Sequence, residues 1–129
     1  MRILSIQSSV SYGHVGNSAA VFPLQRIGHE VMPVFTVMFL IHTGYGEWGG
    51  PLLTGDNVRD VVRGIDARGG LDDVQLVLSG YQGGNDIGDA ILDVGEAQNL
   101  VHVARHQPQV EGQRAGVSLD ALPGEAAAG

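Results

Sequence analysis

The apolar positions of the chain fall first into three short, continuous runs. Residues 3–6, 31–41 and 74–78 are rich in branched apolar side chains. Runs of this kind are typical of β-strands that are buried on both faces, as in a parallel sheet. We therefore expect three buried strands, the first of them beginning close to the N-terminus.

The segment after Asn17 has the features of a helix. Asn17 is a favourable N-cap residue, and Gly28 supplies a stop signal. Pro23 lies inside this segment, and because proline has no backbone N–H to donate, we expect it to bend the helix or unwind it locally. One face of the helix is formed by Ala20, Leu24 and Ile27.

Two further helices are expected, one before and one after the third apolar run. Thr54 caps the earlier helix, and the glycines at 69–70 end it. The later helix begins near Asn85, with Asp86 and Asp89 in its first turn, where the helix dipole favours negative charge. The two apolar stripes, with helical spacing, are Val58, Val61, Val62 and Ile65, and then Ile87, Ala90, Ile91 and Val94.

Strands that alternate with helices predict βαβ units and a mainly parallel sheet covered by helices. With 129 residues and 43% apolar side chains, the chain suffices for one domain. Residues 97–129 differ from the rest, because they contain no aromatic residue and show no sustained period. We expect a domain over residues 1–96 and a flexible tail over residues 97–129, either natural or produced by a frameshift. A short strand or helix near residues 100–103 is the other expectation for this tail.

Charge and composition exclude several classes of protein. The net charge is −7, and the Lys and Arg residues number seven, which is unfavourable for binding nucleic acid or an anionic membrane. No apolar run reaches the length of a membrane span or a signal peptide, so we expect a cytoplasmic protein. The chain has no cysteine, and its five histidines lack the spacing of metal ligands. Any metal is therefore expected to arrive with a nucleotide.

Polar and aromatic residues follow each of the three apolar runs, in segments 7–18, 39–50 and 78–84. Because the carboxyl ends of parallel strands face one crevice, we expect these segments to share a site for a small polar or heteroaromatic ligand. Candidate hydrogen-bonding groups lie on Ser8, His42 and Thr43. For the three segments in turn, the alternative interpretations are an ordinary capped loop, a structural aromatic cluster and a plain turn. Flat aromatic surface is offered by Tyr45, Trp48 and Tyr81.

Residues 44–49 satisfy the dinucleotide-binding pattern G-x-G-x-x-G, with Asp66 near the expected distance for a ribose-binding acid. That motif requires the third glycine to open a helix. Here Pro51 follows directly, and the next helix is expected only near Thr54. We therefore reject the dinucleotide interpretation.

Three spaced blocks together resemble pyridoxal kinases of the ribokinase-like superfamily: QSSVSYGHVGNSAA at residues 7–20, TVMFLIHTGYGEWGG at 36–50 and LSGYQG at 78–83. The resemblance covers residues 1–96. It implies a three-layer αβα fold with a mainly parallel sheet, of which this chain holds the N-terminal portion. It also implies ATP-dependent transfer of phosphate to the 5′-hydroxymethyl of pyridoxal, pyridoxine or pyridoxamine, a phosphotransferase reaction with an alcohol acceptor, and usually a homodimer.

The resemblance also implies which residues of this chain contact the vitamer. Polar contacts to the pyridine ring would come from Ser8, Thr43 and Tyr81, with the backbone of Gly44 beside them. Apolar walls would come from Val37 and Phe39, and His42 would lie near the ring. The chain departs from the family pattern at Leu40 and Ile41, where Ser-Asn is common, and at Gln82, where an apolar residue is usual.

The family's machinery for ATP and Mg²⁺ has no counterpart in these 129 residues. The resemblance implies an Asp-Pro-Val-Met-Gly-like segment and a Gly-x-Gly-Asp turn that carries the catalytic base, and neither occurs here. We assign no catalytic, nucleotide-binding or metal-binding residue. We therefore expect this chain to be a truncated pyridoxal kinase that is inactive, or nearly so, by itself. The alternatives are a B6-vitamer-binding module without catalysis and a non-functional product of a pseudogene or frameshift.

Overall fold

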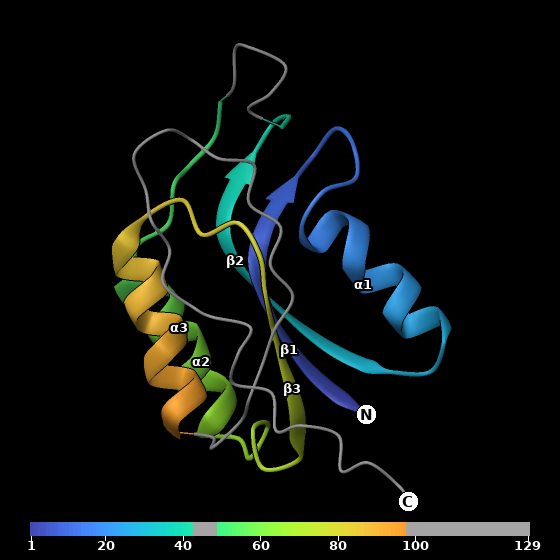
Figure 1. Ribbon diagram of the computed structural model, residues 1–129, viewed down its shortest axis with the longest axis vertical. Coiled ribbons are helices and arrows are strands. Elements are labelled where there is room, and N and C mark those ends of the chain that lie inside the picture. The colour runs from blue at the N-terminus through green and yellow to red at the C-terminus, as the bar shows by residue number, and fades with distance from the viewer. Residues whose placement is uncertain (43–48, 98–129) are drawn as a thin grey trace, which may run out of the picture.

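The computed structural model describes residues 1–42 and 49–97. Within them, strands and helices alternate along the chain: β1 (Arg2–Val10), α1 (Asn17–Arg26), β2 (Glu30–Phe39), α2 (Gly55–Asp66), β3 (Val74–Ser79) and α3 (Asn85–Ala97). The strands form a parallel sheet in the order β2-β1-β3. Helix α1 covers one face, and α2 and α3 cover the other (Figure 1). The α/β class and the three layers of helix, sheet and helix are therefore confirmed.

The main core lies between the sheet and the α2–α3 layer. All four residues of the apolar stripe predicted for α3 are buried in it, as expected. The stripe predicted for α2 is only partly buried, because Val61 is 48% exposed while Val58 and Val62 are in the core. The stripe is wider than the face that the neighbouring elements cover. The buried members of the core are Leu4, Ile6, Val34, Val58, Val62, Leu71, Val74, Val77, Ile87, Ala90, Ile91 and Val94.

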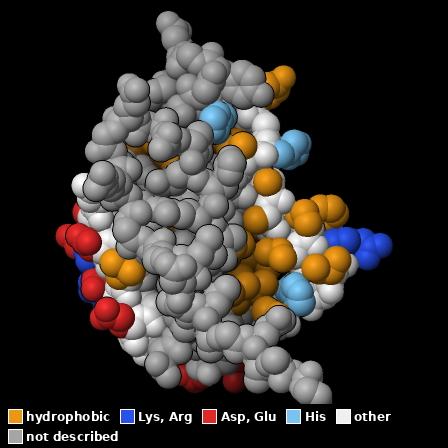
Figure 2. Space-filling model, in the orientation of Figure 1, with side chains coloured by type: hydrophobic (Ala, Val, Ile, Leu, Met, Phe, Trp, Pro, Cys, Tyr) orange, Lys and Arg blue, Asp and Glu red, His pale blue; other side chains and the backbone are white. Residues whose placement is uncertain are grey.

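Helix α1 differs from its prediction in three ways. The N-cap position belongs to Gly16, and Asn17 is the first helical residue. The helix continues through Pro23, so the local unwinding that we expected as the alternative to a bend does not occur. Ile27, predicted to share one helical face with Ala20 and Leu24, is 70% exposed and lies just beyond the last helical residue. Figure 2 shows hydrophobic side chains exposed on the side of the molecule that α1 forms.

The Asn17 side chain does not cap helix α1 as predicted, and it is bonded to the sheet instead. Its side chain is buried, and its amide donates to the backbone carbonyls of Ser5, Gln7 and Val34 at 3.1–3.3 Å. Its Oδ1 accepts a hydrogen bond from the Ser5 hydroxyl at 2.7 Å. The residue therefore fastens the start of α1 to two strands of the sheet.

Strand β1 extends further than the first apolar run predicted. Residues 7–10, expected in a loop, belong to the strand. Ser18 completes the hydrogen bonding of its last residue, because the Ser18 hydroxyl accepts from Val10 N at 3.0 Å and donates to Val10 O at 2.8 Å. A hydroxyl thus takes the place of a pairing strand at this end of β1.

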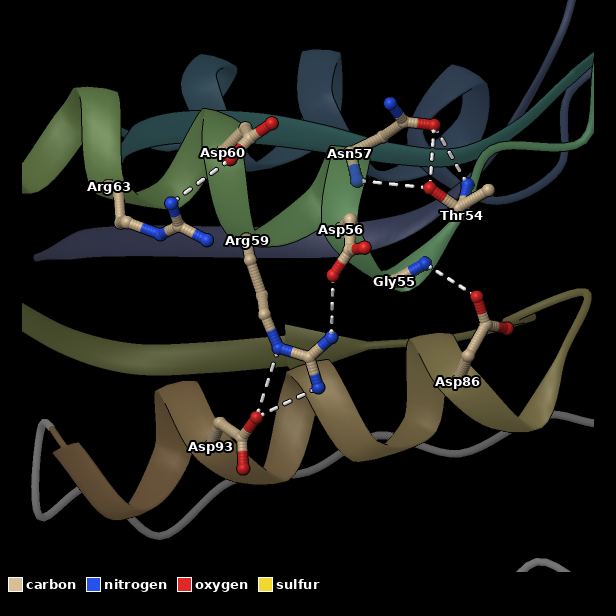
Figure 3. A network of polar contacts seen from close by, with 9 residues as sticks. All are labelled: Thr54, Gly55, Asp56, Asn57, Arg59, Asp60, Arg63, Asp86 and Asp93. Carbon is tan, nitrogen blue, oxygen red and sulfur yellow. Dashed lines mark hydrogen bonds and ion pairs between the residues drawn. The ribbon is translucent and has the colours of Figure 1, made fainter.

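The first turns of α2 and α3 lie side by side and are joined by a hydrogen bond (Figure 3). The cap predicted at Thr54 is confirmed, and it forms a reciprocal capping box with Asn57. The Asp86 carboxylate, in the first turn of α3, accepts a hydrogen bond from Gly55 N at 2.7 Å. One carboxylate therefore satisfies an N–H at the start of the neighbouring helix as well as lying in the positive first turn of its own.

Further along the same helices, the Arg59 guanidinium bridges Asp93 of α3 at 2.9 Å and Asp56 of its own helix at 3.3 Å (Figure 3). The hydrogen bond with Asp93 raises the pKa of Arg59, so the guanidinium keeps its charge over the whole working pH range. Acidic side chains gather on this side of the molecule (Figure 2). The interhelical ion pair is therefore formed on an acidic, solvated surface.

Candidate functional site

The pairing of β1 with β2 is irregular near the carboxyl edge of the sheet. The register shifts between Gln7 and Ser9. Two residues of β2, Thr36 and Val37, therefore lie opposite the single residue Ser8. A bulge of this kind redirects side chains and is common beside functional sites. The ends of β1 and β2, both predicted to border the site, therefore meet at this bulge.

Ser8 carries a buried hydroxyl group that has no hydrogen-bond partner among the described residues. Its exposed fraction is 6%, and Gly16 lies against it. The nearby hydroxyls of Ser5, Ser9 and Ser18 all take part in hydrogen bonds. A buried hydroxyl that lacks a partner costs free energy, and such groups call for a functional explanation.

The loop after β3 crosses the end of β1 and reaches β2. The Thr36 hydroxyl donates a hydrogen bond to the backbone carbonyl of Tyr81 at 2.6 Å. Gly83 has φ 82°, and a Cβ placed there would lie 2.9 Å from Cγ1 of Val37. The loop that carries Tyr81 is therefore held against the bulge opposite Ser8.

A small apolar cluster lies beside this loop. Val10, Val37 and Phe39 are buried in it, and Val15 and Tyr81 are half-buried against them. Val37 and Phe39 are 0% and 4% exposed, so the structure places them within the cluster. The cluster brings together the ends of β1 and β2 and the loop after β3. Direct contact of Val37 and Phe39 with a ligand stays a prediction.

Beyond β2, the chain returns antiparallel to the strand end. Met38 N donates to Pro51 O at 3.1 Å and Leu40 N to Gly49 O at 2.7 Å. His42, which is half-buried, lies beyond the second of these pairs, in the segment between Leu40 and Gly49. The remaining predicted residues of this segment, Thr43, Gly44, Tyr45 and Trp48, lie outside the described residues, as does the tail from residue 98 onward.

Two residues of this edge were not among those predicted, namely Thr36 and Gly16. Thr36 is the only polar residue in the run 31–41, and it is completely buried. That isolated threonine was a usable signal, because a buried hydroxyl needs a specific partner. Gly16 gave no comparable signal within a segment rich in small residues.

The ATP and Mg²⁺ that the resemblance implies would need donor side chains on the protein. Over residues 1–42 and 49–97, no group of three or more His, Asp or Glu side chains is arranged to hold a metal ion. Mg²⁺ keeps several waters and usually takes only one or two carboxylates together with phosphate oxygens. The described residues therefore offer no preformed cage for a metal ion, and none of them is assigned to Mg²⁺.

Comparison with known proteins identifies relatives of the N-terminal 72% of the chain. Over 93 residues it is 66% identical to pyridoxal kinase PdxY from Corynebacterium diphtheriae and 66% identical to that from Leifsonia xyli. The fold matches pyridoxal kinase from Leishmania donovani in complex with ADP and pyridoxamine, with a TM-score of 0.67 and 35% identity over 76% of this chain and 36% of that one. No family model matches the chain.

These similarities confirm both the resemblance stated from the three sequence blocks and the ribokinase-like fold. The chain spans about a third of the length of the curated relatives that it matches, since the aligned part is 33% of each. Among the described helices, none is long and apolar enough to cross a membrane.

Proposed function

With the homology of its first 72% to pyridoxal kinases as the premise, we propose that this chain forms the vitamer-binding part of such an enzyme. The whole enzyme would transfer the γ-phosphate of ATP to the 5′-hydroxymethyl of pyridoxal, pyridoxine or pyridoxamine. This chain would hold the pyridine ring at the carboxyl edge of its sheet. The position agrees with the rule that ligands of open parallel sheets bind beyond the carboxyl ends of the strands.

The observation that carries the proposal is the buried Ser8 hydroxyl without a partner in the described part of the chain. A polar atom of a vitamer ring would supply that partner and remove the cost of burial. Tyr81, half-buried beside the apolar cluster, would add flat surface and a hydroxyl. Thr43 and Gly44 would complete the polar contacts, with His42 near the ring and Val37 and Phe39 supporting its apolar side.

We further propose that the 129-residue chain binds a vitamer but does not phosphorylate it by itself. Phosphoryl transfer depends on Mg²⁺, on charge neutralisation and on a base that orients the attacking hydroxyl. Among the described residues, no group of three or more His, Asp or Glu side chains is arranged to hold a metal ion. The two sequence segments associated with ATP and the base are also missing from the 129 residues. A non-catalytic vitamer-binding module is thus the alternative that makes the same binding prediction.

Equilibrium dialysis with pyridoxal tests the binding proposal. The unaltered chain is expected to bind saturably, and Ser8→Ala is expected to weaken binding about tenfold, as the loss of one buried hydrogen bond implies. Ser11→Ala is the matched control, because Ser11 is exposed just beyond the same strand. Binding that is absent, or equal in the Ser8 and Ser11 variants, would contradict the proposal.

A coupled assay for pyridoxal 5′-phosphate, with ATP and Mg²⁺ added, tests the catalytic part of the proposal. We expect no turnover above the level without protein. Robust turnover would overturn this part while leaving vitamer binding intact. Binding without turnover agrees with both the kinase fragment and the non-catalytic module, whereas the absence of both would favour a non-functional product.

The homodimer that the resemblance implies is also proposed for this chain. Sedimentation equilibrium distinguishes a monomer from a dimer. A concentration-independent monomer mass would contradict the proposal.

A further inference from the structure

We propose that Thr36 is a positioning residue that fixes the orientation of Tyr81 for vitamer binding. The inference rests on the proposed function, since it concerns how Tyr81 reaches the ring. Thr36 itself lies in the bulge of β2 and is completely buried, so it acts through Tyr81 and does not touch the vitamer.

The contact between the two residues is short and buried on the Thr36 side. Thr36 Oγ1 lies 2.6 Å from Tyr81 O, at the short end of the range for hydroxyl donors. Thr36 is 0% exposed, so its hydroxyl has no access to water. The bond links β2 to a loop that follows the far strand of the sheet, since β1 lies between β2 and β3.

The loop itself has little intrinsic stiffness. Gly80 precedes Tyr81, and Gly83 and Gly84 follow one residue later. Glycine restricts the backbone less than any other residue. Gly80 N donates a hydrogen bond to Ile6 O at 3.2 Å, which anchors the loop just before Tyr81. The Tyr81 carbonyl itself is held by the Thr36 hydroxyl. The direction of the Tyr81 side chain is therefore expected to depend on this bond.

The bulge explains why Thr36 is available for this contact. Two residues of β2 oppose Ser8, so the strand is redirected at the position that carries the hydroxyl. Val37, the other residue of the bulge, lies against Gly83 of the same loop. Thr36 and Val37, neighbours in β2, thus contact the loop at Tyr81 and at Gly83.

The test compares Thr36→Val, which removes the hydroxyl at almost constant volume, with Thr36→Ser, which retains it. A methyl group needs about 3.3 Å from a carbonyl oxygen, so valine displaces the Tyr81 carbonyl by roughly 0.7 Å. In the full 129-residue chain, Thr36→Val is expected to weaken pyridoxal binding about tenfold. Thr36→Ser is expected to bind within about twofold of the unaltered chain.

A second measurement separates this inference from the proposed function. Amide hydrogen exchange at residues 81–84 is expected to accelerate in Thr36→Val relative to the core amides of β1, and to recover in Thr36→Ser. Unchanged loop exchange in Thr36→Val, or equal acceleration in both variants, would overturn the positioning role. Normal vitamer binding by Thr36→Val would overturn it as well. Failure of the unaltered chain to bind pyridoxal would instead overturn the proposed function, and the exchange comparison would still decide whether Thr36 orders the loop.

Discussion

Gly16 lies so close to Ser8 that a Cβ at this glycine would overlap both the carbonyl and the hydroxyl oxygen of Ser8. Its backbone, with φ 55° and ψ −134°, is also in a region that residues with a side chain rarely adopt. The start of α1 is therefore in direct contact with the serine that we propose for vitamer binding. Only glycine allows this approach.

Gly16→Ala is predicted to destabilise the chain by about 3 kcal/mol, because backbone strain and steric overlap act together. Gly28→Ala is the matched control, since Gly28 also has a positive φ, of 97°, but nothing lies within 4 Å of the position that a Cβ would occupy there. That control should cost about 1 kcal/mol from backbone conformation alone. Urea denaturation of both variants measures the difference, and equal costs would contradict the close approach at Gly16.

Asn17→Ala is predicted to cost about 3 kcal/mol, because it leaves the Ser5 hydroxyl and three strand carbonyls without their amide partner. Asn57→Ala is the control at an exposed capping position and should cost about 1 kcal/mol. Thermal and urea unfolding provide the comparison. A similar small loss in both variants would show that Asn17 acts as an ordinary cap.

Gly64→Ala is predicted to stabilise the chain by about 0.7 kcal/mol, because alanine restricts the unfolded backbone and favours a helix. Gly64 lies inside α2, and nothing is within 4 Å of the position that its Cβ would take. Gly55→Ala in the same helix should destabilise instead, since its Cβ would overlap the carbonyl oxygen of Asp86. Unfolding midpoints that shift in the same direction for both variants would contradict the packing of α2 against α3.

Arg59→Gln is predicted to lower the melting temperature slightly at low salt and not at all in about 1 M NaCl, where screening is nearly complete. The pKa of Arg59 is raised in the folded state, so its contribution is fully present below the ordinary arginine pKa and is lost only at extreme alkaline pH. Salt is therefore the informative variable. Arg63→Gln, which removes a pair within α2 alone, is the control and should lower the melting temperature less than Arg59→Gln at low salt. A loss for Arg59→Gln that persists in high salt would point to packing of its stem.

Local patterns in the sequence sufficed for the order of the elements, the Thr54 cap and the buried stripe of α3, because each depends on residues within a few positions of one another. Asn17 shows where such patterns fail. The same side chain suits a helix cap and a bond to strand carbonyls, and only the arrangement of the strands decides between them. The bulge at Thr36 and Val37 depends on pairing with Ser8, far away in the chain, so no local pattern could predict it.

The most direct test of the central claim is a two-dimensional NMR titration of the chain with pyridoxal. Saturable shifts are expected in the amide signals of Ser8, Val37 and Tyr81 and in those of their neighbours at the carboxyl edge of the sheet. Signals on the outer surface of α2 and α3, such as that of Arg59, should stay in place. Shifts confined to the outer surface of these helices, or no saturable shift at any concentration of pyridoxal, would contradict a vitamer site at this edge.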